Sequence, residues 1–307
     1  MKAAFFMKNG GPEVMQYGDV PDPVAGPGQV LVDVHAASVN AADWKVRAGS
    51  YAPITEFPYV PGRDFSGIVS ALGAGVTDLA VGDAVFGVCD VGQEAAYAEK
   101  LAIKSAIVAR KPDSLSHVEC AALALTGITA LCAIEDTLQL KSGETILIQG
   151  GAGGVASFAI QVAKHIGARV ITSASAANHD YLRGLGADQI IDYHKQDVTK
   201  VVSGCDAMFD TVGGDVAMRS FAVLRPGGRA AFIASGNTAP VSPRADVKSL
   251  RPKVGRDRAH LERILALVAA GVVHIPEITL YALKHAAAAH RVSEGRHLRG
   301  KLVFKVR

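Results

Sequence analysis

The sequence has few cysteines, little net charge and no long apolar run, and each of these absences excludes a class of protein. Its four cysteines include no Cys-x-x-Cys pair, which argues against a disulfide framework. The 32 basic and 29 acidic residues leave a net charge of +3, which makes nucleic acid an unlikely main partner. No stretch of about 18 uninterrupted apolar residues occurs, so we expect no membrane span. The N-terminal apolar run is also too short for a secretion signal, and we expect a cytoplasmic protein.

What is present is typical of a globular protein with more than one domain. Hydrophobic residues make up 49% of the chain and charged residues 20%, which excludes intrinsic disorder. At about 150 residues per domain, a chain of 307 residues suggests two domains. The 32 glycines follow no collagen period, so we expect them at turns and close backbone approaches.

The first part of the chain, up to about Ser116, has the pattern of a β-rich domain. Short runs of alternating or β-branched residues are separated by proline and glycine, among them Gln29–His35, Phe65–Ala71 and Ala84–Val88. This pattern predicts antiparallel strands joined by loops.

From about Ser116 the chain alternates between strand and helix patterns, which predicts a doubly wound parallel sheet. The expected strands are 145–149, 170–173, 189–192, 207–210 and 229–234, and the expected helices are 155–166, 179–185 and 215–224. The last part contains expected helices near 260–270 and 283–290 and a final strand, 301–305. A chain that begins β-rich and ends in helix and strand can return its tail to the first domain.

The segment 151–156, GAGGVA, follows an expected strand and opens an expected helix, as a dinucleotide-binding turn does. We expect Gly151 to allow the tight turn and Gly153 to let the backbone approach a pyrophosphate at the helix N-terminus. Ala156 takes the third position, where a small residue lets helix and strand pack closely. A glycine-rich turn without a ligand is the alternative interpretation.

The end of the second strand of this unit carries no carboxylate. An NAD-selective site has an acid there to bind the ribose 2′-hydroxyl, and in this chain the place falls at Ser175. Without an acid, a 2′-phosphate meets no repulsion and finds hydroxyl donors, to which Tyr193 can add another. No Arg or Lys lies within 173–178, so the expectation of NADPH as cofactor depends mainly on the missing acid.

Several longer segments, spread in order over nearly the whole chain, match one known pattern. They are ASVNAADWKVRAGSY, PYVPGRDFSGIV, GGAGGVASFAIQVAKHIGARVITSAS, LGADQIIDY, FDTVGG, LRPGGR and GRHLRGKLVFKV. These segments resemble the medium-chain dehydrogenase/reductase superfamily, and within it the zinc-independent quinone oxidoreductase, or zeta-crystallin-like, branch. The resemblance implies an α/β fold in which a Rossmann doubly wound parallel sheet is joined to a β-rich GroES-like catalytic domain.

The same resemblance implies the domain organisation and the activity. Residues 1–118 and 262–307 would form the GroES-like catalytic domain, and residues 119–261 the Rossmann NADP-binding domain. The activity would be NADPH-dependent reduction of a small quinone or α,β-unsaturated carbonyl by hydride transfer, and the protein would be a homodimer.

The positions that bind zinc in other members of the superfamily carry other residues here. Asn40 stands where zinc members have a cysteine ligand, and Gly62-Arg63-Asp64 stands where they have Gly-His-Glu. The ten histidines form no compact ligand set, so we expect no metal. A quinone or enone can still accept a hydride, because hydrogen bonds can stabilise the charge that develops on its oxygen.

The resemblance also places the expected catalytic residues Asn40, Asp43 and Tyr51 in one segment. Asn40 would lie near the nicotinamide or the acceptor, where its amide can donate to a developing enolate. Tyr51 would be a proton donor, a role that water could also fill. The structural alternatives are a bracing amide at Asn40, a hydrogen-bond acceptor at Asp43 and a packing residue at Tyr51.

Two further positions match parts of the family that hold the cofactor. Thr126, in the run LALTGITA, matches a residue that touches the nicotinamide, and Gly300 with Lys301 matches a Gly-Lys pair that closes over the cofactor. A helix-packing threonine and an edge-strand charge are the alternatives. The complete expected cofactor-binding set is Asn40, Thr126, Gly151, Gly153, Gly154, Val155, Ser175, Tyr193, Ile233, Gly300, Lys301 and Leu302.

The segment Arg244–Arg263 is locally basic, with seven basic and three acidic residues. It is either a solvated face or a surface that meets an anion. The second interpretation would fit an enoyl-thioester reductase whose substrate carries a phosphopantetheine or CoA phosphate. A third function is an NADPH-binding sensor or RNA-binding protein with little turnover, against which the intact Asn40, Thr126 and glycine turn argue.

Overall fold

The computed structural model describes residues 1–51, 53–54 and 56–307, and the chain divides into two compact units. Unit 1 comprises residues 1–125, 256–266 and 275–307, and unit 2 comprises residues 126–255 and 267–274. Both ends of the chain therefore belong to unit 1. The divisions fall at 125/126, inside helix α2 (His117–Leu131), and at 255/256, whereas the sequence predicted domain boundaries at 118/119 and 261/262; residues 267–274, expected in the first domain, belong to unit 2.

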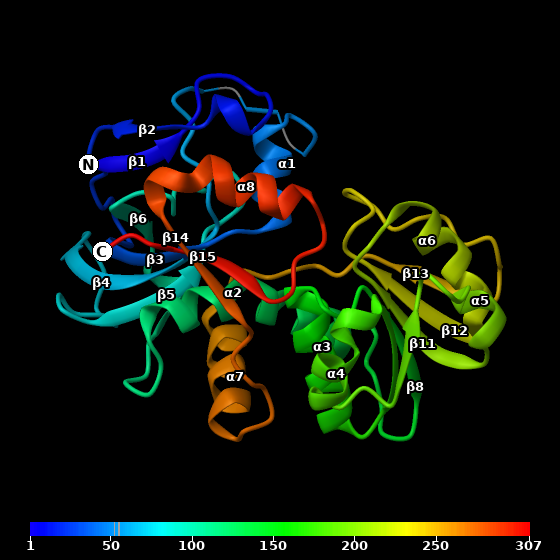
Figure 1. Ribbon diagram of the computed structural model, residues 1–307. Coiled ribbons are helices and arrows are strands. Elements are labelled where there is room, and N and C mark those ends of the chain that lie inside the picture. The colour runs from blue at the N-terminus through cyan, green and yellow to red at the C-terminus, as the bar shows by residue number, and fades with distance from the viewer. Residues whose placement is uncertain (52, 55) are drawn as a thin grey trace. The chain divides into compact units, whose positions relative to one another are not determined.

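Unit 1 is built on a seven-stranded sheet in the order β14-β15-β3-β4-β5-β7, with β6 also paired to β3. Its strands are β3 (Gln29–Ser38), β4 (Asp64–Leu72), β5 (Ala84–Val88), β6 (Lys100–Lys104), β7 (Val108–Arg110), β14 (Ile278–Ala282) and β15 (Lys301–Lys305). The pairs are antiparallel except β14 with β15. Because β15 pairs with β3, the C-terminal strand lies beside the N-terminal part of the chain (Figure 1).

Unit 1 also contains a small hairpin, the first part of α2 and further helices. The hairpin pairs β1 (Lys2–Phe5) with β2 (Gln16–Asp19), and the helices are α1 (Ala41–Arg47), α7 (Arg258–Ala269) and α8 (Ala286–Glu294). The side chains of Val30, Val32 and Val34 alternate along β3 into the buried core, as the period of a half-buried strand requires. Arg47, fully buried at the end of α1, bonds His290 and Glu294 of α8 and so fixes the two helices together.

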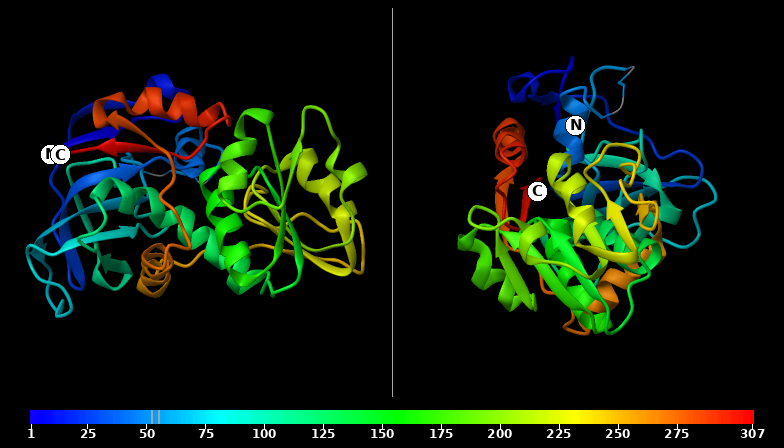
Figure 2. Two further views of the ribbon diagram at one scale, coloured as in Figure 1. Left: turned by 60° about the horizontal axis from the view of Figure 1, so that its bottom comes forward. Right: turned by 90° about the vertical axis from the view of Figure 1, so that its right-hand side faces the viewer.

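Unit 2 contains a six-stranded parallel sheet in the order β10-β9-β8-β11-β12-β13. Its strands are β8 (Thr145–Gln149), β9 (Arg169–Ala174), β10 (Gln189–Asp192), β11 (Cys205–Asp210), β12 (Leu224–Phe232) and β13 (Lys248–Leu250). Helices α3 (Gly154–Ile166) and α4 (His179–Gly184) cover one face, and α5 (Val198–Val201) and α6 (Gly214–Ser220) cover the other (Figures 1 and 2). The strand order reverses between β8 and β11, as in a Rossmann sheet, so the predicted fold class is confirmed.

Several elements, among them β1, β2, β13 and α1, were not predicted from the sequence, and two local differences have a clear physical reason. The Pro226-Gly227-Gly228 turn lies inside β12, where the register shifts between the pairs Cys205–Leu224 and Ala207–Arg229. Gly227 has a φ of +74°, so the extra residues form a bulge instead of ending the strand. Strand β14 was not predicted, because its half-exposed sequence has no clear period.

Residues 117–137, which form α2 and the π-helical turn η3 (Cys132–Thr137), are long and apolar enough to cross a membrane by length and composition. In the 18-residue apolar window of this helix, 78% of the window is buried inside the protein, and a buried core helix passes the same test of length and composition. None of the four cysteines, all buried and all in the described part of the chain, forms a disulfide.

The short 3-10 turns are η1 (Pro12–Val14), η2 (Ser105–Ile107), η4 (Ala176–Asn178), η5 (Phe221–Val223) and η6 (Leu283–His285).

Candidate active site

The glycine-rich turn of unit 2 connects β8 to α3. Gly150 takes the left-handed conformation, with a φ of +77°, and Gly151 lies within the turn that the Gly153 N–H closes by donating to the Gly150 carbonyl at 3.0 Å. Gly151 is required for another reason: its N–H donates to the Ser173 carbonyl at 3.0 Å, and a Cβ atom there would collide with Thr172. Gly153 is the N-cap of α3, so the first N–H groups of this helix, beginning with Gly154 and Val155, have no acceptor within it. Such an end is suited to bind phosphate oxygens.

The hydroxyl groups of β9 brace this turn, which sequence reasoning missed. Thr172 Oγ1 donates to a carbonyl of β8 at 2.6 Å. Ser173 Oγ donates to the Gln149 side chain and accepts from the Gly150 N–H at 3.2 Å. The hydroxyls of Thr172 and Ser173 therefore already have hydrogen-bond partners inside unit 2. Ser175 is the serine that follows the end of β9. Paired small hydroxyls opposite a glycine-rich turn are the signal that could have indicated this bracing.

Ser175 and Tyr193 follow directly after β9 and β10, which end side by side in register. Ser175 is half-buried and accepts a hydrogen bond from Asn178 at 3.1 Å, while Tyr193 is 47% exposed. Lys195, also missed, lies two residues beyond Tyr193 with its side chain 76% exposed and 3.9 Å from Asp192. This edge of the sheet therefore carries two hydroxyls and an exposed cation.

The remaining expected cofactor residues of unit 2 are Ile233 and Thr126. Ile233 follows β12, is half-buried, and donates its N–H to the Asp210 carbonyl at 3.2 Å. The Asp210 carboxylate accepts from the Gly213 N–H at 2.9 Å and so shapes the FDTVGG loop, while burial raises its pKa. Thr126 lies on α2 and is 5% exposed.

In unit 1, Asn40 is the N-cap of α1 and the centre of a polar network. Its backbone N–H donates to the Asp43 carboxylate at 2.8 Å, as in a capping box. Its side-chain Oδ1 accepts from Lys301 Nζ at 2.8 Å, and its Nδ2 donates to Asp64 Oδ2 at 3.0 Å. The chain segments that supply these groups are the start of α1, the start of β4 and the start of β15.

Lys301 and Asp64 are the buried charges of this network. Lys301 is 3% exposed and Asp64 0%, and their charged atoms are 3.8 Å apart. Lys301 Nζ also donates to the Val39 carbonyl at 2.9 Å, and Ser38 Oγ donates to Asp64 at 2.5 Å. Burial lowers the pKa of Lys301 and raises that of Asp64.

Gly300 and Leu302, on either side of Lys301, are fixed by their own contacts. Gly300 has a φ of +73°, and a Cβ atom there would collide with the Glu277 carbonyl. Leu302 is 1% exposed in the core of unit 1, and its carbonyl accepts from the Val39 N–H at 2.9 Å. The expected cofactor residues 300–302 therefore hold β15 in place and aim the Lys301 ammonium at Asn40.

Asp43 is buried, and both of its carboxylate oxygens have partners. Oδ1 accepts from Arg63 at 3.3 Å, and Oδ2 accepts from the Tyr97 hydroxyl at 2.9 Å in addition to the Asn40 N–H. Burial raises the pKa of Asp43 to about 6, against the opposing effect of Arg63. Arg63 forms a second buried ion pair with Glu94 at 2.7 Å. This geometry fits Asp43 as a hydrogen-bond acceptor that holds the Asn40 backbone, Arg63 and Tyr97 in place.

Tyr51 lies next to this ion-pair cluster. The Arg63 guanidinium carbon is 5.1 Å from the centre of the Tyr51 ring, which is the geometry of a cation–π contact. Arg63 is 2% exposed, whereas Tyr51 is only half-buried. Unit 1 thus brings Asn40, Asp43 and Tyr51 into one connected group, with Asn40 and Tyr51 partly open and Asp43 enclosed.

Comparison with known proteins identifies the family. Residues 26–113 match the family described as "Alcohol dehydrogenase GroES-like domain", and residues 185–304 match "Zinc-binding dehydrogenase". The 2-haloacrylate reductase of Burkholderia sp is 33% identical over 98% of each chain. The quinone oxidoreductase structure from Coxiella burnetii has a TM-score of 0.90 and 35% identity, and covers 100% of this chain and 99% of that one. The chain belongs to the medium-chain dehydrogenase/reductase superfamily, in its zinc-independent quinone oxidoreductase branch.

Other members of the family are also similar to this chain. The 2-methylene-furan-3-one reductase of Solanum lycopersicum is 35% identical over 78% of this chain, which spans 64% of its length. The NADPH-dependent alkenal/one oxidoreductase of Arabidopsis thaliana is 32% identical over 83% of this chain and 69% of its own. The Escherichia coli quinone oxidoreductase complexed with NADPH has a TM-score of 0.91 and 26% identity over 100% of each chain. The protein is accordingly an oxidoreductase of the quinone and enone reductase kind.

In this chain, the positions that hold zinc ligands in other members of the superfamily carry groups that have buried polar partners. Asn40 and Asp64 both face the Lys301 ammonium, and Arg63 is paired with Asp43 and Glu94. An amide and a guanidinium are poor replacements for the cysteine and histidine ligands of zinc. The fixed positive charges at this place are the side chains of Lys301 and Arg63.

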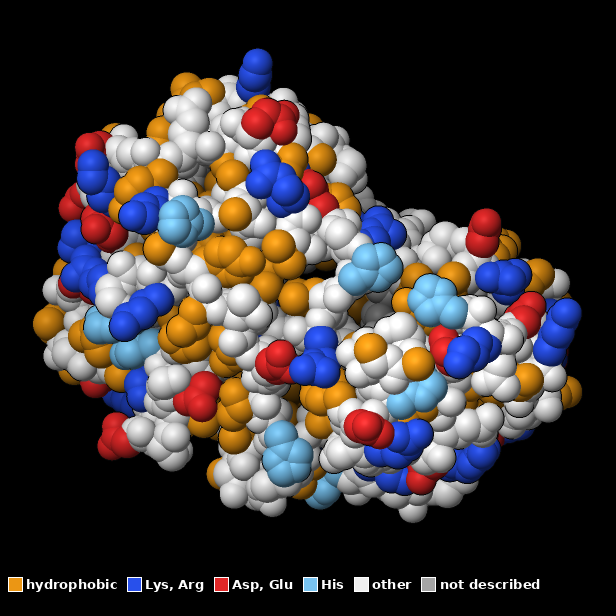
Figure 3. Space-filling model, viewed as in Figure 1, with side chains coloured by type: hydrophobic (Ala, Val, Ile, Leu, Met, Phe, Trp, Pro, Cys, Tyr) orange, Lys and Arg blue, Asp and Glu red, His pale blue; other side chains and the backbone are white. Residues whose placement is uncertain are grey.

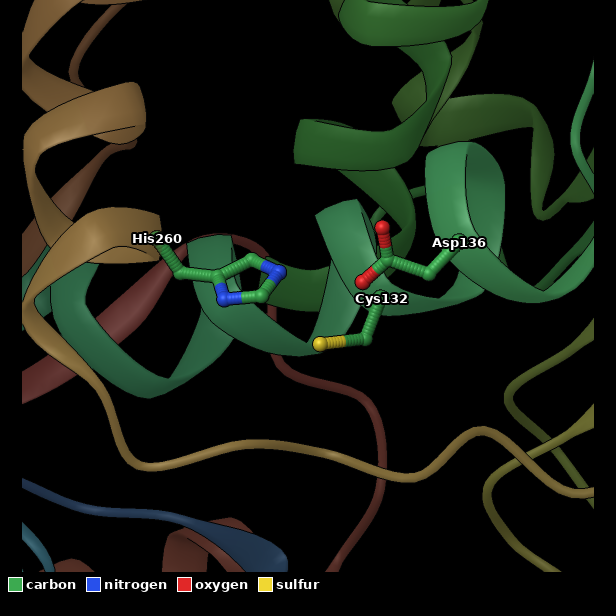
Figure 4. Close-up of side chains that lie close together, drawn as sticks. All are labelled: Cys132, Asp136 and His260. Carbon is green, nitrogen blue, oxygen red and sulfur yellow. The ribbon is translucent and has the colours of Figure 1, made fainter.

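Three metal-capable side chains of the protein belong to different units. Cys132 and Asp136 lie one turn apart on η3 of unit 2, and His260 lies on α7 of unit 1 (Figure 4). His260 Nδ1 is 2.8 Å from both carboxylate oxygens of Asp257, in its own unit. Neither unit by itself contains the set.

The basic segment Arg244–Arg263 is divided between the two units at 255/256. Several of its arginines bind backbone carbonyls: Arg251 that of Phe232 at 2.6 Å, and Arg258 that of Val108 at 2.7 Å. On the face shown in Figure 3, basic and acidic side chains are interspersed. Much of the positive charge of this segment therefore serves the packing of its own unit.

Proposed function

We propose that this protein is an NADPH-dependent, zinc-independent reductase of quinones or α,β-unsaturated carbonyls. The observation that carries the proposal is the Asn40 amide, held by Lys301 and Asp64 where zinc members of the superfamily have a metal ligand. A fixed amide donor can stabilise the oxygen of an activated acceptor as charge develops on it. The reductases among the relatives, named for a haloacrylate, an alkenal/one and a quinone, support this class of acceptor.

The residues of unit 2 fit a bound NADPH. The glycines at the end of β8 leave the first turn of α3 open to the pyrophosphate. Ser175, Tyr193 and Lys195 offer two hydroxyls and a cation for a 2′-phosphate, and no carboxylate lies in 172–175. When bound, the reduced nicotinamide supplies the hydride, as NADPH does for chemistry of this kind.

Each side chain of unit 1 has a distinct part in the proposed reaction. Asn40 donates to the acceptor oxygen, and Tyr51 or water returns a proton. Asp43 holds the Asn40 backbone, Arg63 and Tyr97 in place, because both of its oxygens are already bonded. We therefore assign Asp43 a positioning role, not proton transfer. The protein is proposed to act in the cytoplasm as a homodimer, which sedimentation would test.

A panel of acceptors tests this function directly. Steady-state oxidation of NADPH is measured with a small quinone, a cyclic enone, a linear alkenal and a saturated ketone. The proposal predicts turnover of the first three and none of the ketone. Activity on the ketone alone, or on none of the four, would contradict it.

The first prediction concerns the cofactor. NADPH should bind at least about tenfold more tightly than NADH, a difference of about 1.4 kcal/mol. Ser175→Asp should reverse the preference, because its carboxylate repels the 2′-phosphate and binds the ribose hydroxyls of NADH. Fluorescence titration of both cofactors measures this. The exposed Ser203→Asp, in the same unit, is the control and should change neither affinity. Equal affinities in the wild type would contradict the prediction.

The second prediction concerns metal. The purified protein should contain no stoichiometric zinc, and incubation with a chelator should leave its turnover unchanged, because Asn40 and Arg63 stand where zinc ligands would be needed. Elemental analysis and assay after chelation are the measurements. Metal at one equivalent, lost together with activity, would refute the assignment.

Reduction of an enoyl thioester is the second candidate function. The mycocerosic acid synthase-like polyketide synthase of Mycobacterium tuberculosis is 30% identical over 92% of this chain, which spans 14% of that protein. The acceptor is again a conjugated carbonyl, so the same Asn40 donor would serve it. Adding an enoyl-CoA and the matching simple thioester to the panel separates this function from quinone or enone reduction. A preference for the CoA ester would require basic side chains that bind its phosphates. Much of the Arg244–Arg263 segment instead binds backbone carbonyls of its own unit.

A further inference from the structure

We propose that Lys301 is a positioning residue that fixes the orientation of the Asn40 amide, an inference that rests on the function proposed above. Lys301 Nζ donates to Asn40 Oδ1 at 2.8 Å, and Asn40 Nδ2 donates to Asp64 Oδ2 at 3.0 Å. The amide is therefore held from both of its ends by groups of opposite charge.

The chemistry of the two partners decides which way the amide points. An ammonium can only donate hydrogen bonds, and an ionised carboxylate can only accept them. A flipped amide would place its NH₂ group against Lys301 and its oxygen against Asp64, losing both bonds. Lys301 and Asp64 together therefore select one of the two orientations.

The selected orientation leaves one N–H of Asn40 for a substrate. The Nδ2 group has two hydrogens, and in the described part of the chain it makes one hydrogen bond, to Asp64. Lys301, Asp64 and Ser38 are buried, whereas Asn40 is half-buried. Among these four side chains, Asn40 is the one through which the network reaches an accessible surface.

Burial also separates this role from direct cofactor binding. Lys301 is 3% exposed, and its ammonium contacts the Val39 carbonyl, Asn40 and Asp64, all within unit 1. The Gly-Lys pair of the family was expected to close over the cofactor. In this chain the lysine side chain reaches the Asn40 amide, so the proposed influence of Lys301 on the reaction passes through Asn40.

The test is a double-mutant cycle of Lys301→Met and Asn40→Ala. Lys301→Met should lower kcat on a cyclic enone by about tenfold or more, approaching the 10²-fold loss typical of a missing oxyanion donor, with a smaller loss on a quinone. In the Asn40→Ala background the same change should lower kcat by less than about twofold, because the group on which Lys301 acts is gone. The affinity for NADPH should stay unchanged in all variants.

Two further variants keep the test decisive. Lys305→Met, on the same strand but exposed, is the matched control and should leave kcat unchanged. If Lys301→Met alone does not fold, Lys301→Met with Asp64→Asn removes both buried charges and takes its place in the cycle.

Three outcomes would overturn the inference. Losses in kcat that multiply would show that Lys301 acts independently of Asn40. Weaker NADPH binding with an intact kcat would make Lys301 a cofactor ligand. If the wild-type protein failed to oxidise NADPH with any quinone or enone tested, the proposed function would be refuted as well. The first two outcomes would leave that function standing.

Discussion

Replacing Asn40 by alanine should lower kcat and kcat/KM together with an enone substrate, on the order of 10²-fold or ~3 kcal/mol. The Asn40 amide is held rigidly, with Oδ1 on Lys301 and Nδ2 on Asp64, so it can stabilise charge on the acceptor oxygen without first reorganising. A loss in both constants is the mark of an interaction made in the transition state. Steady-state kinetics with a cyclic enone at saturating NADPH are the measurement.

The size of the effect should depend on the acceptor. A quinone, which is intrinsically easier to reduce, should lose less than a sluggish enone, because less stabilisation is required of the protein. Asn9→Ala is a matched control: its amide bonds the Val46 and Arg47 carbonyls at the other end of α1, so it should affect stability more than kcat. Weaker NADPH binding with kcat intact would make Asn40 a cofactor-positioning residue, and Tyr51→Phe would then be the next variant to measure.

Replacing Arg63 by methionine should destabilise the protein by about 3–5 kcal/mol. Arg63 is 2% exposed and forms ion pairs with Asp43 and Glu94, whose side chains are 1% and 4% exposed. Without the guanidinium, the carboxylates of Asp43 and Glu94 stay buried and lose the cation with which both are paired. The loss should be seen as a lower midpoint of urea denaturation for the transition that involves unit 1.

An exposed ion pair of the same unit provides the comparison. Arg110 pairs with Asp83 at 3.0 Å, but its side chain is 61% exposed. Arg110→Met should therefore cost less than about 1 kcal/mol. Equal, small effects of the two substitutions would show that the Arg63 cluster contributes little to the stability of unit 1.

Much of the fold could be predicted from the sequence, because local patterns specify its elements. The strands 189–192 and 301–305 were predicted with the boundaries that the structure has, since each is a short apolar run that follows a segment containing glycine, Gly186 and Gly300 respectively. Helix α3 was predicted within one residue, because its apolar residues recur with the helical period and Gly167 ends it with a φ of +93°. Strand β14 has no such pattern, and its place depends on pairing with β15.

The contacts of the candidate site could not be predicted in the same way. Lys301 and Asn40 are separated by 261 positions, and only the pairing of β15 with β3 brings them together. The sequence marked Lys301 as a cofactor residue, and that stays a prediction, whereas its bond to the Asn40 amide could be seen only from the path of β15. Likewise, the glycine motif located the turn, but backbone torsions are needed to see that Gly150, and not Gly151, takes the left-handed conformation.

The most direct test of the proposed function follows the hydride itself. NADPH carrying deuterium at both hydrogen positions of C4 of the nicotinamide is oxidised with a cyclic enone, and the product is analysed by NMR and mass spectrometry. Hydride transfer to the conjugated system predicts a saturated ketone with one deuterium at the β-carbon. An allylic alcohol with deuterium on the carbinol carbon, or a saturated ketone free of deuterium, would contradict the account.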